Sequence, residues 1–79
     1  MKRENIHRQV HEVLTLVLGA GLPDPEVTRD TVPTWDSLRH VEIIFAVEEA
    51  FGVQFSEDEM ANVSSLSEFV DIVEAHLAA

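Results

Sequence analysis

The sequence predicts an all-α fold: a small four-helix bundle with a long first loop and a short third helix. Apolar residues recur at spacings of three and four in three long segments. Twice in the second half, serine and glutamate stand three residues apart, the spacing of a capping box. No segment alternates polar and apolar residues as a half-buried strand does. A chain of 79 residues has room for one domain, expected to span residues 1–79.

The first helix is expected over residues 3–18, with its apolar residues on one face. These residues are Ile6, Val10, Val13, Leu14, Val17 and Leu18. Gly19 and Gly21 are typical of a helix end. Residues 19–35 contain three prolines and form a connection so long that it indicates either a short internal turn or a function. Trp35 closes this connection and is expected to pack over the loop rather than contact a ligand.

The second helix is expected over residues 36–51, with Asp36 as its N-cap and Gly52 as its stop. Its apolar residues do not fit on one face. At about 100° per residue, one side forms the core face. That side holds Ile43, Ile44, Val47, Ala50 and Phe51. Leu38, Val41 and Phe45 fall on the opposite side, within roughly 60° of one another.

We call Leu38, Val41 and Phe45 the outer stripe; glutamates flank it on both edges. Glu42 and Glu49 lie on one edge and Glu48 on the other. An apolar strip rimmed by charge is a candidate binding surface, because carboxylates attract a basic partner and the strip supplies the desolvated contact. The alternative is that another helix of the bundle covers it.

Two further helices follow. Ser56-Glu57-Asp58-Glu59 is expected to start a short helix that ends near Asn62. Ser65 and Glu68 open the last helix. The apolar residues of that helix are Leu66, Phe69, Val70, Ile72, Val73 and Leu77. His76 is expected to interact with the helix dipole or to be exposed.

The charge and the absence of cysteine exclude several function classes. The net charge is −10, and all five Lys and Arg residues lie in the first half. Such a chain should repel nucleic acid and attract partners with basic patches, unless its acidity serves only solubility. Without cysteine there is no disulfide, thiolate metal site or thiol nucleophile, and cytoplasm is the natural compartment. No signal peptide or membrane span is evident, and a monomer is expected.

Ser37 stands at the first position of the second helix, where Asp36 already does the capping. Its hydroxyl should point outward, beside a helix end that suits an attached phosphate. The alternative is an ordinary first-turn serine. His40, three residues on, points toward the core and is not placed as a base for a serine nucleophile. His7 and His11 have the i, i+4 spacing of metal ligands, but no third ligand is suggested; we predict exposed histidines and no metal site.

The segment from Asp36-Ser37-Leu38 through Val41-Glu42-Ile43, Ala46-Val47-Glu48-Glu49 and Phe51-Gly52-Val53 resembles the second helix of acyl carrier proteins. Phe55, the acidic Glu57-Asp58-Glu59 and Ser65-Leu66 extend the resemblance over nearly the whole chain. It implies a discrete, stand-alone carrier and not an enzyme. It also implies that a phosphopantetheinyl transferase moves 4′-phosphopantetheine from coenzyme A onto Ser37, between Asp36 and Leu38.

The resemblance further implies that the thiol of this arm carries acyl groups as thioesters between partner enzymes. These would be acyl-loading, ketosynthase or acyltransferase-type enzymes with basic patches, in fatty-acid, polyketide or other specialised biosynthesis. The implied partner surface comprises Leu38, Val41, Glu42, Phe45, Glu48, Glu49, Glu57 and Glu59.

Three departures from the common fatty-acid pattern favour a specialised pathway. Thr34-Trp35 stands where Leu-Gly and a small residue usually precede the Asp-Ser-Leu motif. Arg39 follows the motif where an acidic or amide residue is frequent, and Phe45 stands where Met or Leu is frequent. Arg39 either contacts the phosphate or is solvated. A peptidyl or aminoacyl carrier is one alternative, and an unmodified acidic all-α protein-interaction module is the other.

Overall fold

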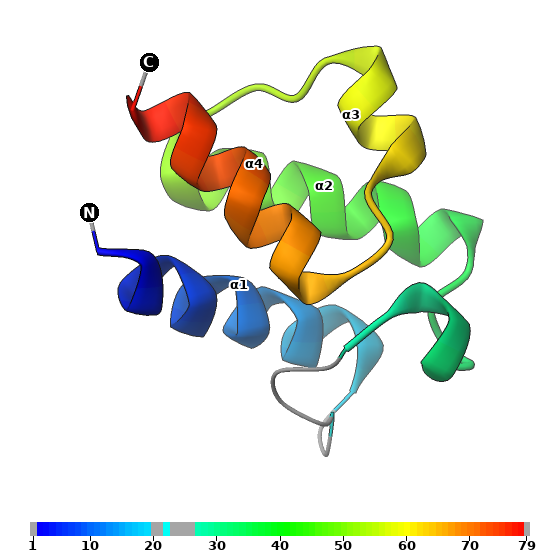
Figure 1. Ribbon diagram of the computed structural model, residues 1–79. Coiled ribbons are helices and arrows are strands. Elements are labelled where there is room, and N and C mark those ends of the chain that lie inside the picture. Colours follow the sequence, from blue (N-terminus) through cyan, green and yellow to red (C-terminus); the bar gives the residue numbers. More distant parts are fainter. Residues whose placement is uncertain (1, 20–21, 23–26, 79) are drawn as a thin grey trace.

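The computed structural model describes residues 2–19, 22 and 27–78, and its regular elements are helical (Figure 1). They are the α-helices α1 (Arg3–Leu18), α2 (Ser37–Phe51), α3 (Glu57–Asn62) and α4 (Leu66–Ala78), with a short 3-10 helix, η1 (Arg29–Thr31). The all-α prediction is confirmed, including the short third helix and a short turn within the long first connection. None of these helices is long and apolar enough to cross a membrane, within the residues described.

The helix ends follow from local sequence. The Asp36 carboxylate accepts a hydrogen bond from Arg39 N at 2.9 Å and caps α2. Gly52 ends α2 in the left-handed region at φ 65°, which glycine adopts without strain. Ser56 and Glu59 form the predicted capping box at the start of α3. At α4, Ser65 Oγ accepts from Glu68 N, but the Glu68 carboxylate accepts from Ser64 N, so the reciprocal bond is displaced by one residue.

The core lies where α1 packs against α2 and α4 (Figure 1). Phe69 of α4 is wholly buried at its centre, with its ring 5.8 Å from that of Phe55 and 6.1 Å from that of Trp35. The other buried apolar residues are Ile6, Val10, Leu14, Leu18, Val27, Val32, Ile43, Ile44, Val47, Val63, Leu66, Val70 and Val73. Burial of this surface is the main source of stability in a chain of this size.

The expectations for Ala50 and His76 need correction. Ala50 was expected on the core face of α2 but is exposed. It stands in the last turn of the helix, where the helical angle gives the direction of a side chain but not how far the neighbouring helices extend. His76 is half-buried, and it does more than interact with the helix dipole. Its Nε2 bonds the Glu59 carboxylate at 2.9 Å, and its ring stacks on Phe55, so it ties α4 to α3.

The Glu59 carboxylate makes stability depend on pH. A hydrogen bond from the backbone N–H of Ser56, and next the contact with His76, hold the pKa of Glu59 below its ordinary value. The folded state therefore binds a proton less readily than the unfolded state. The resulting stabilisation is fully present above the ordinary glutamate pKa of about 4.3 and is lost as pH falls through the lower folded value.

We expect Glu59→Gln to flatten the acid limb of the stability curve. The free energy of unfolding, measured by urea denaturation from about pH 6 down to pH 3, should fall less steeply in this variant than in the parent chain. Glu57→Gln removes the same charge from the same turn of α3 and is the control. Parallel curves for Glu59→Gln and the parent chain would contradict this assignment.

Candidate functional site

Ser37 is the first residue of α2, and its side chain is exposed. Its hydroxyl is not used as a cap, because the Asp36 carboxylate already accepts from Arg39 N. A helix of 15 residues carries partial positive charge and unpaired N–H groups at this end. The site is thus an accessible hydroxyl beside a positive helix end.

The guanidinium of Arg29 forms a hydrogen bond with this hydroxyl. Its Nη2 donates to Ser37 Oγ at 3.4 Å. Arg39, which was expected either to contact the phosphate or to be solvated, has its Nη1 3.4 Å from the Glu42 carboxylate. One feature of the sequence could have pointed to Arg29. Arg29 is one of only five Lys and Arg residues in a chain with a net charge of −10.

A long-range pairing places Arg29 at the site. Arg29 N donates to Ser64 O and Leu66 N donates to Val27 O, each at 2.8 Å. An isolated antiparallel bridge joins Thr28 to Ser65 between them. The loop before η1 is therefore bound to the α3–α4 connection, which no local pattern in the sequence predicts.

Behind Ser37, a buried histidine ties the start of α2 to α3. Trp35 Nε1 donates to His40 Nδ1 at 3.1 Å, so the ring proton is on Nε2, which donates to Met60 O at 2.7 Å. Trp35 is 3% exposed and stacks on Phe69, which confirms its predicted packing role. His40 is buried, as predicted, and its two ring nitrogens are both engaged.

The outer stripe is uncovered. Leu38 is 64% exposed, Val41 47% and Phe45 61%, so no helix of the described chain buries it. Val41 and Phe45 also line an open pocket of about 410 Å³ between α2 and α3. Its other lining residues are His40, Ile44, Glu57, Met60 and Ala61.

The predicted glutamates divide into two groups. Glu42, Glu49 and Glu57 are exposed, and Glu42 is paired with Arg39. Glu48 and Glu59 are half-buried and have partners within the fold. The Glu48 carboxylate accepts a hydrogen bond from Phe55 N at 2.7 Å. The Glu59 carboxylate accepts a hydrogen bond from Ser56 N and bonds His76 Nε2. The second group therefore also shapes the α2–α3 connection and the start of α3.

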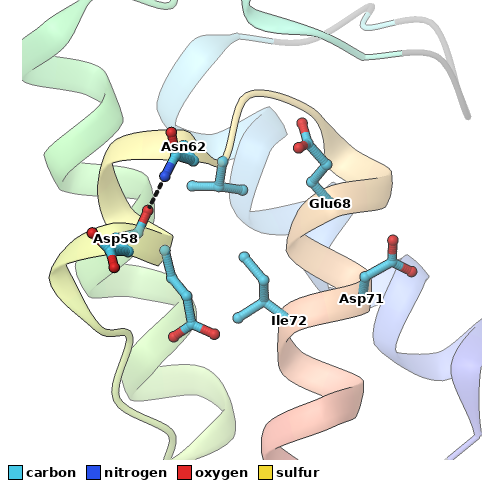
Figure 2. A pocket seen from close by; sticks show the side chains of 7 residues that line it. Asp58, Asn62, Glu68, Asp71 and Ile72 are labelled. Atoms are coloured by element: carbon cyan, nitrogen blue, oxygen red, sulfur yellow. Dashed lines mark hydrogen bonds between the residues drawn. The ribbon is translucent and has the colours of Figure 1, made fainter.

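A second, more acidic groove lies between α3 and α4 (Figure 2). Ile72 stands in its middle, with Asp58 and Asn62 of α3 on one side and Glu68 and Asp71 of α4 on the other. These side chains do not converge. Within residues 2–19, 22 and 27–78, no group of three or more histidine or acidic residues could hold a metal ion. His7 and His11 are half-buried, not exposed as expected.

Comparisons with known proteins agree on one class. The family model described as "Phosphopantetheine attachment site" matches residues 35–73. The acyl carrier protein of Rubrobacter xylanophilus is 33% identical over 81 residues, covering the whole of both chains. That of Coprothermobacter proteolyticus is 28% identical, covering 98% of this chain and 96% of its own. Acyl carrier protein 3 of Ralstonia nicotianae is 46% identical over 43 residues, 54% of this chain and 49% of its own.

Proposed function

The chain belongs to the acyl carrier protein family. We propose that Ser37 is the attachment point of the prosthetic group and that the chain shuttles acyl groups between biosynthetic enzymes. The family carries covalent 4′-phosphopantetheine, so the chain is a carrier and not a catalyst. The observation that carries the proposal is that Ser37 is exposed at the positive end of α2 and that Asp36, not Ser37, caps this helix.

The residues around Ser37 fit a phosphodiester. The helix end favours negative charge. The flanking Asp36 carboxylate accepts a hydrogen bond from the backbone N–H of Arg39. Leu38 presents an apolar side chain next to the attachment point. When bound, the group supplies a terminal thiol that holds acyl groups as thioesters, which this chain cannot supply because it has no cysteine. In the transfer by a phosphopantetheinyl transferase, Ser37 Oγ loses its proton and bonds to the phosphorus that carries pantetheine. A P–O bond of the coenzyme A pyrophosphate breaks, and 3′,5′-ADP leaves.

The absence of cysteine gives a sharp test. The pure chain is incubated with coenzyme A, Mg²⁺ and a broad-specificity phosphopantetheinyl transferase, desalted, and titrated for thiols with a colorimetric disulfide reagent. We expect one thiol per chain, against none before incubation. A folded chain that gains no thiol with several transferases would contradict the carrier proposal and favour the unmodified interaction module.

We further propose that partner enzymes bind the outer stripe and the glutamates around it. The apolar side chains Leu38, Val41 and Phe45 are exposed side by side, an arrangement that is costly in water without a partner. Glu42, Glu49 and Glu57 give this face a negative potential that suits basic patches on the enzymes. Glu48 and Glu59 add to that potential while bonded within the fold.

The pathway is proposed from the departures near Ser37. Trp35, one of the residues that depart from the common fatty-acid pattern, is buried and donates a hydrogen bond to the buried His40. This supports a specialised biosynthesis, such as a polyketide pathway, over common fatty-acid synthesis, with an aminoacyl cargo as the alternative. Loading assays with matched acyl and aminoacyl donors distinguish them.

Phe45→Ala is expected to weaken partner binding without unfolding the chain. The side chain is 61% exposed, so its loss should change stability by less than about 0.5 kcal/mol. Because Phe45 is a central aromatic contact of the proposed surface, its removal should weaken binding to the transferase by at least about 2 kcal/mol, roughly a 30-fold rise in Kd. Calorimetric titration measures this, with Leu16→Ala, exposed on α1, as the control.

The same titration tests the glutamates. Affinity of the parent chain should fall as salt rises, because the screening length shortens to about 8 Å at physiological ionic strength. Equal affinities of Phe45→Ala and Leu16→Ala, or binding that is independent of salt, would contradict this partner surface.

A further inference from the structure

We propose that Arg29 is a positioning residue that binds the phosphodiester of the 4′-phosphopantetheine arm and so fixes the direction in which the arm leaves the protein. The inference rests on the proposed attachment at Ser37. It begins from the contact between Arg29 Nη2 and Ser37 Oγ, at 3.4 Å. A phosphorus bonded to this oxygen places charged oxygens beside the same guanidinium, where charge-assisted hydrogen bonds are shorter and stronger than a bond to a hydroxyl.

The backbone of Arg29 is fixed before any ligand is present. Arg29 N donates to Ser64 O at 2.8 Å, and the Thr28 and Thr31 hydroxyls on either side of it lie 2.9 Å apart. Val27 and Val32, which flank this segment, are buried in the core. The guanidinium is therefore carried by an ordered segment, and binding an anion costs little backbone entropy.

Two other arginines, Arg39 and Arg3, form ion pairs within the fold. Arg39, also close to Ser37 in sequence, has Nη1 3.4 Å from the Glu42 carboxylate. Arg3 is bound to Asp71 and Glu74 at the far end of the bundle. Among the described residues, no carboxylate forms an ion pair with Arg29, whose recorded side-chain partner is the Ser37 hydroxyl.

The residue type supports this assignment. The planar guanidinium presents several donors in a fork that matches phosphate oxygens, whereas an ammonium is a point charge. The end of α2 adds its own positive potential beside the same oxygens. Together they hold the phosphate against the η1 side of the site, so the arm starts from one orientation instead of sweeping freely about Ser37.

The experiment compares Arg29→Gln, Arg29→Lys and the matched control Arg39→Gln, each converted with a phosphopantetheinyl transferase and a ¹³C-labelled coenzyme A. Intact mass first shows that each chain carries the group; a parent chain that gains none overturns the proposed function, and with it this inference. On the converted chains, NMR records the ³¹P shift of the phosphodiester and the relaxation of the two pantoate methyl groups beside it. In the parent chain it also records the Arg29 guanidinium protons before and after conversion.

We expect conversion to shift the Arg29 guanidinium resonances. Arg29→Gln should shift the ³¹P resonance and make the pantoate methyl groups more mobile. Arg29→Lys should fall between that variant and the parent chain, and Arg39→Gln should match the parent chain. If converted Arg29→Gln has the parent's ³¹P shift and methyl mobility, or if Arg39→Gln changes them equally, Arg29 does not hold the phosphate, while attachment at Ser37 stands.

Discussion

Ser37→Ala is expected to abolish attachment of 4′-phosphopantetheine while leaving the four helices intact. The substitution removes the only atom that the transferase can modify at this position, so the gain of mass and of a thiol should be lost completely. The fold should persist because Asp36, not Ser37, caps α2 and because alanine suits the first turn of a helix. Thermal unfolding followed by circular dichroism should differ little from that of the parent chain.

Ser56→Ala provides the opposite result and serves as the control. Ser56 Oγ accepts from Glu59 N at 3.1 Å and caps α3, so its loss should cost about 0.5–2 kcal/mol of stability. Attachment at Ser37 should be retained. A Ser37→Ala chain that still gains a thiol, or that fails to fold, would contradict the division of roles between Asp36 and Ser37.

Phe69→Ala is expected to remove most of the stability of the chain. Phe69 is fully buried and contacts the rings of Trp35, His40 and Phe55 from three other segments. Loss of a buried phenylalanine side chain costs about 3–5 kcal/mol, against a total of about 4–12 kcal/mol for a domain of 79 residues. Urea denaturation followed by circular dichroism measures the loss.

Leu77→Ala, in the same helix, removes a large apolar side chain that is 41% exposed and should have a much smaller effect. If Phe69→Ala is too unstable to measure, Phe69→Leu retains much of the volume and should still lower the urea midpoint more than Leu77→Ala does. Similar midpoints for Phe69→Leu and Leu77→Ala would contradict the central position of Phe69.

The helices could be predicted closely because their signals are local. The bounds of α1 match the expected residues 3–18, and α2 and α3 begin at the predicted caps Asp36 and Ser56. The apolar period that marks a helix face also separated the core side of α2 from the outer stripe, whose exposure the structure confirms. A cap and a 3.6-residue period each involve residues within one turn, so a sequence alone contains them.

The features that the sequence did not predict are those that join distant segments. The bridge between Thr28 and Ser65 and the bond from His76 to Glu59 link residues far apart in the chain. Arg29, whose guanidinium bonds Ser37, is itself held by a backbone bond to Ser64 beside that bridge. Periodicity also gives no measure of how far one helix extends along another, which is why Ala50 was wrongly assigned to the core.

The central claim is that Ser37 carries the prosthetic group, and peptide mapping tests it most directly. The chain has five serines, Ser37, Ser56, Ser64, Ser65 and Ser67, so its total mass alone does not identify the modified residue. After conversion and proteolysis, tandem mass spectrometry should find phosphopantetheine on Ser37 and on no other residue. Phosphopantetheine on another serine or threonine, or on none in a folded chain, would contradict the account.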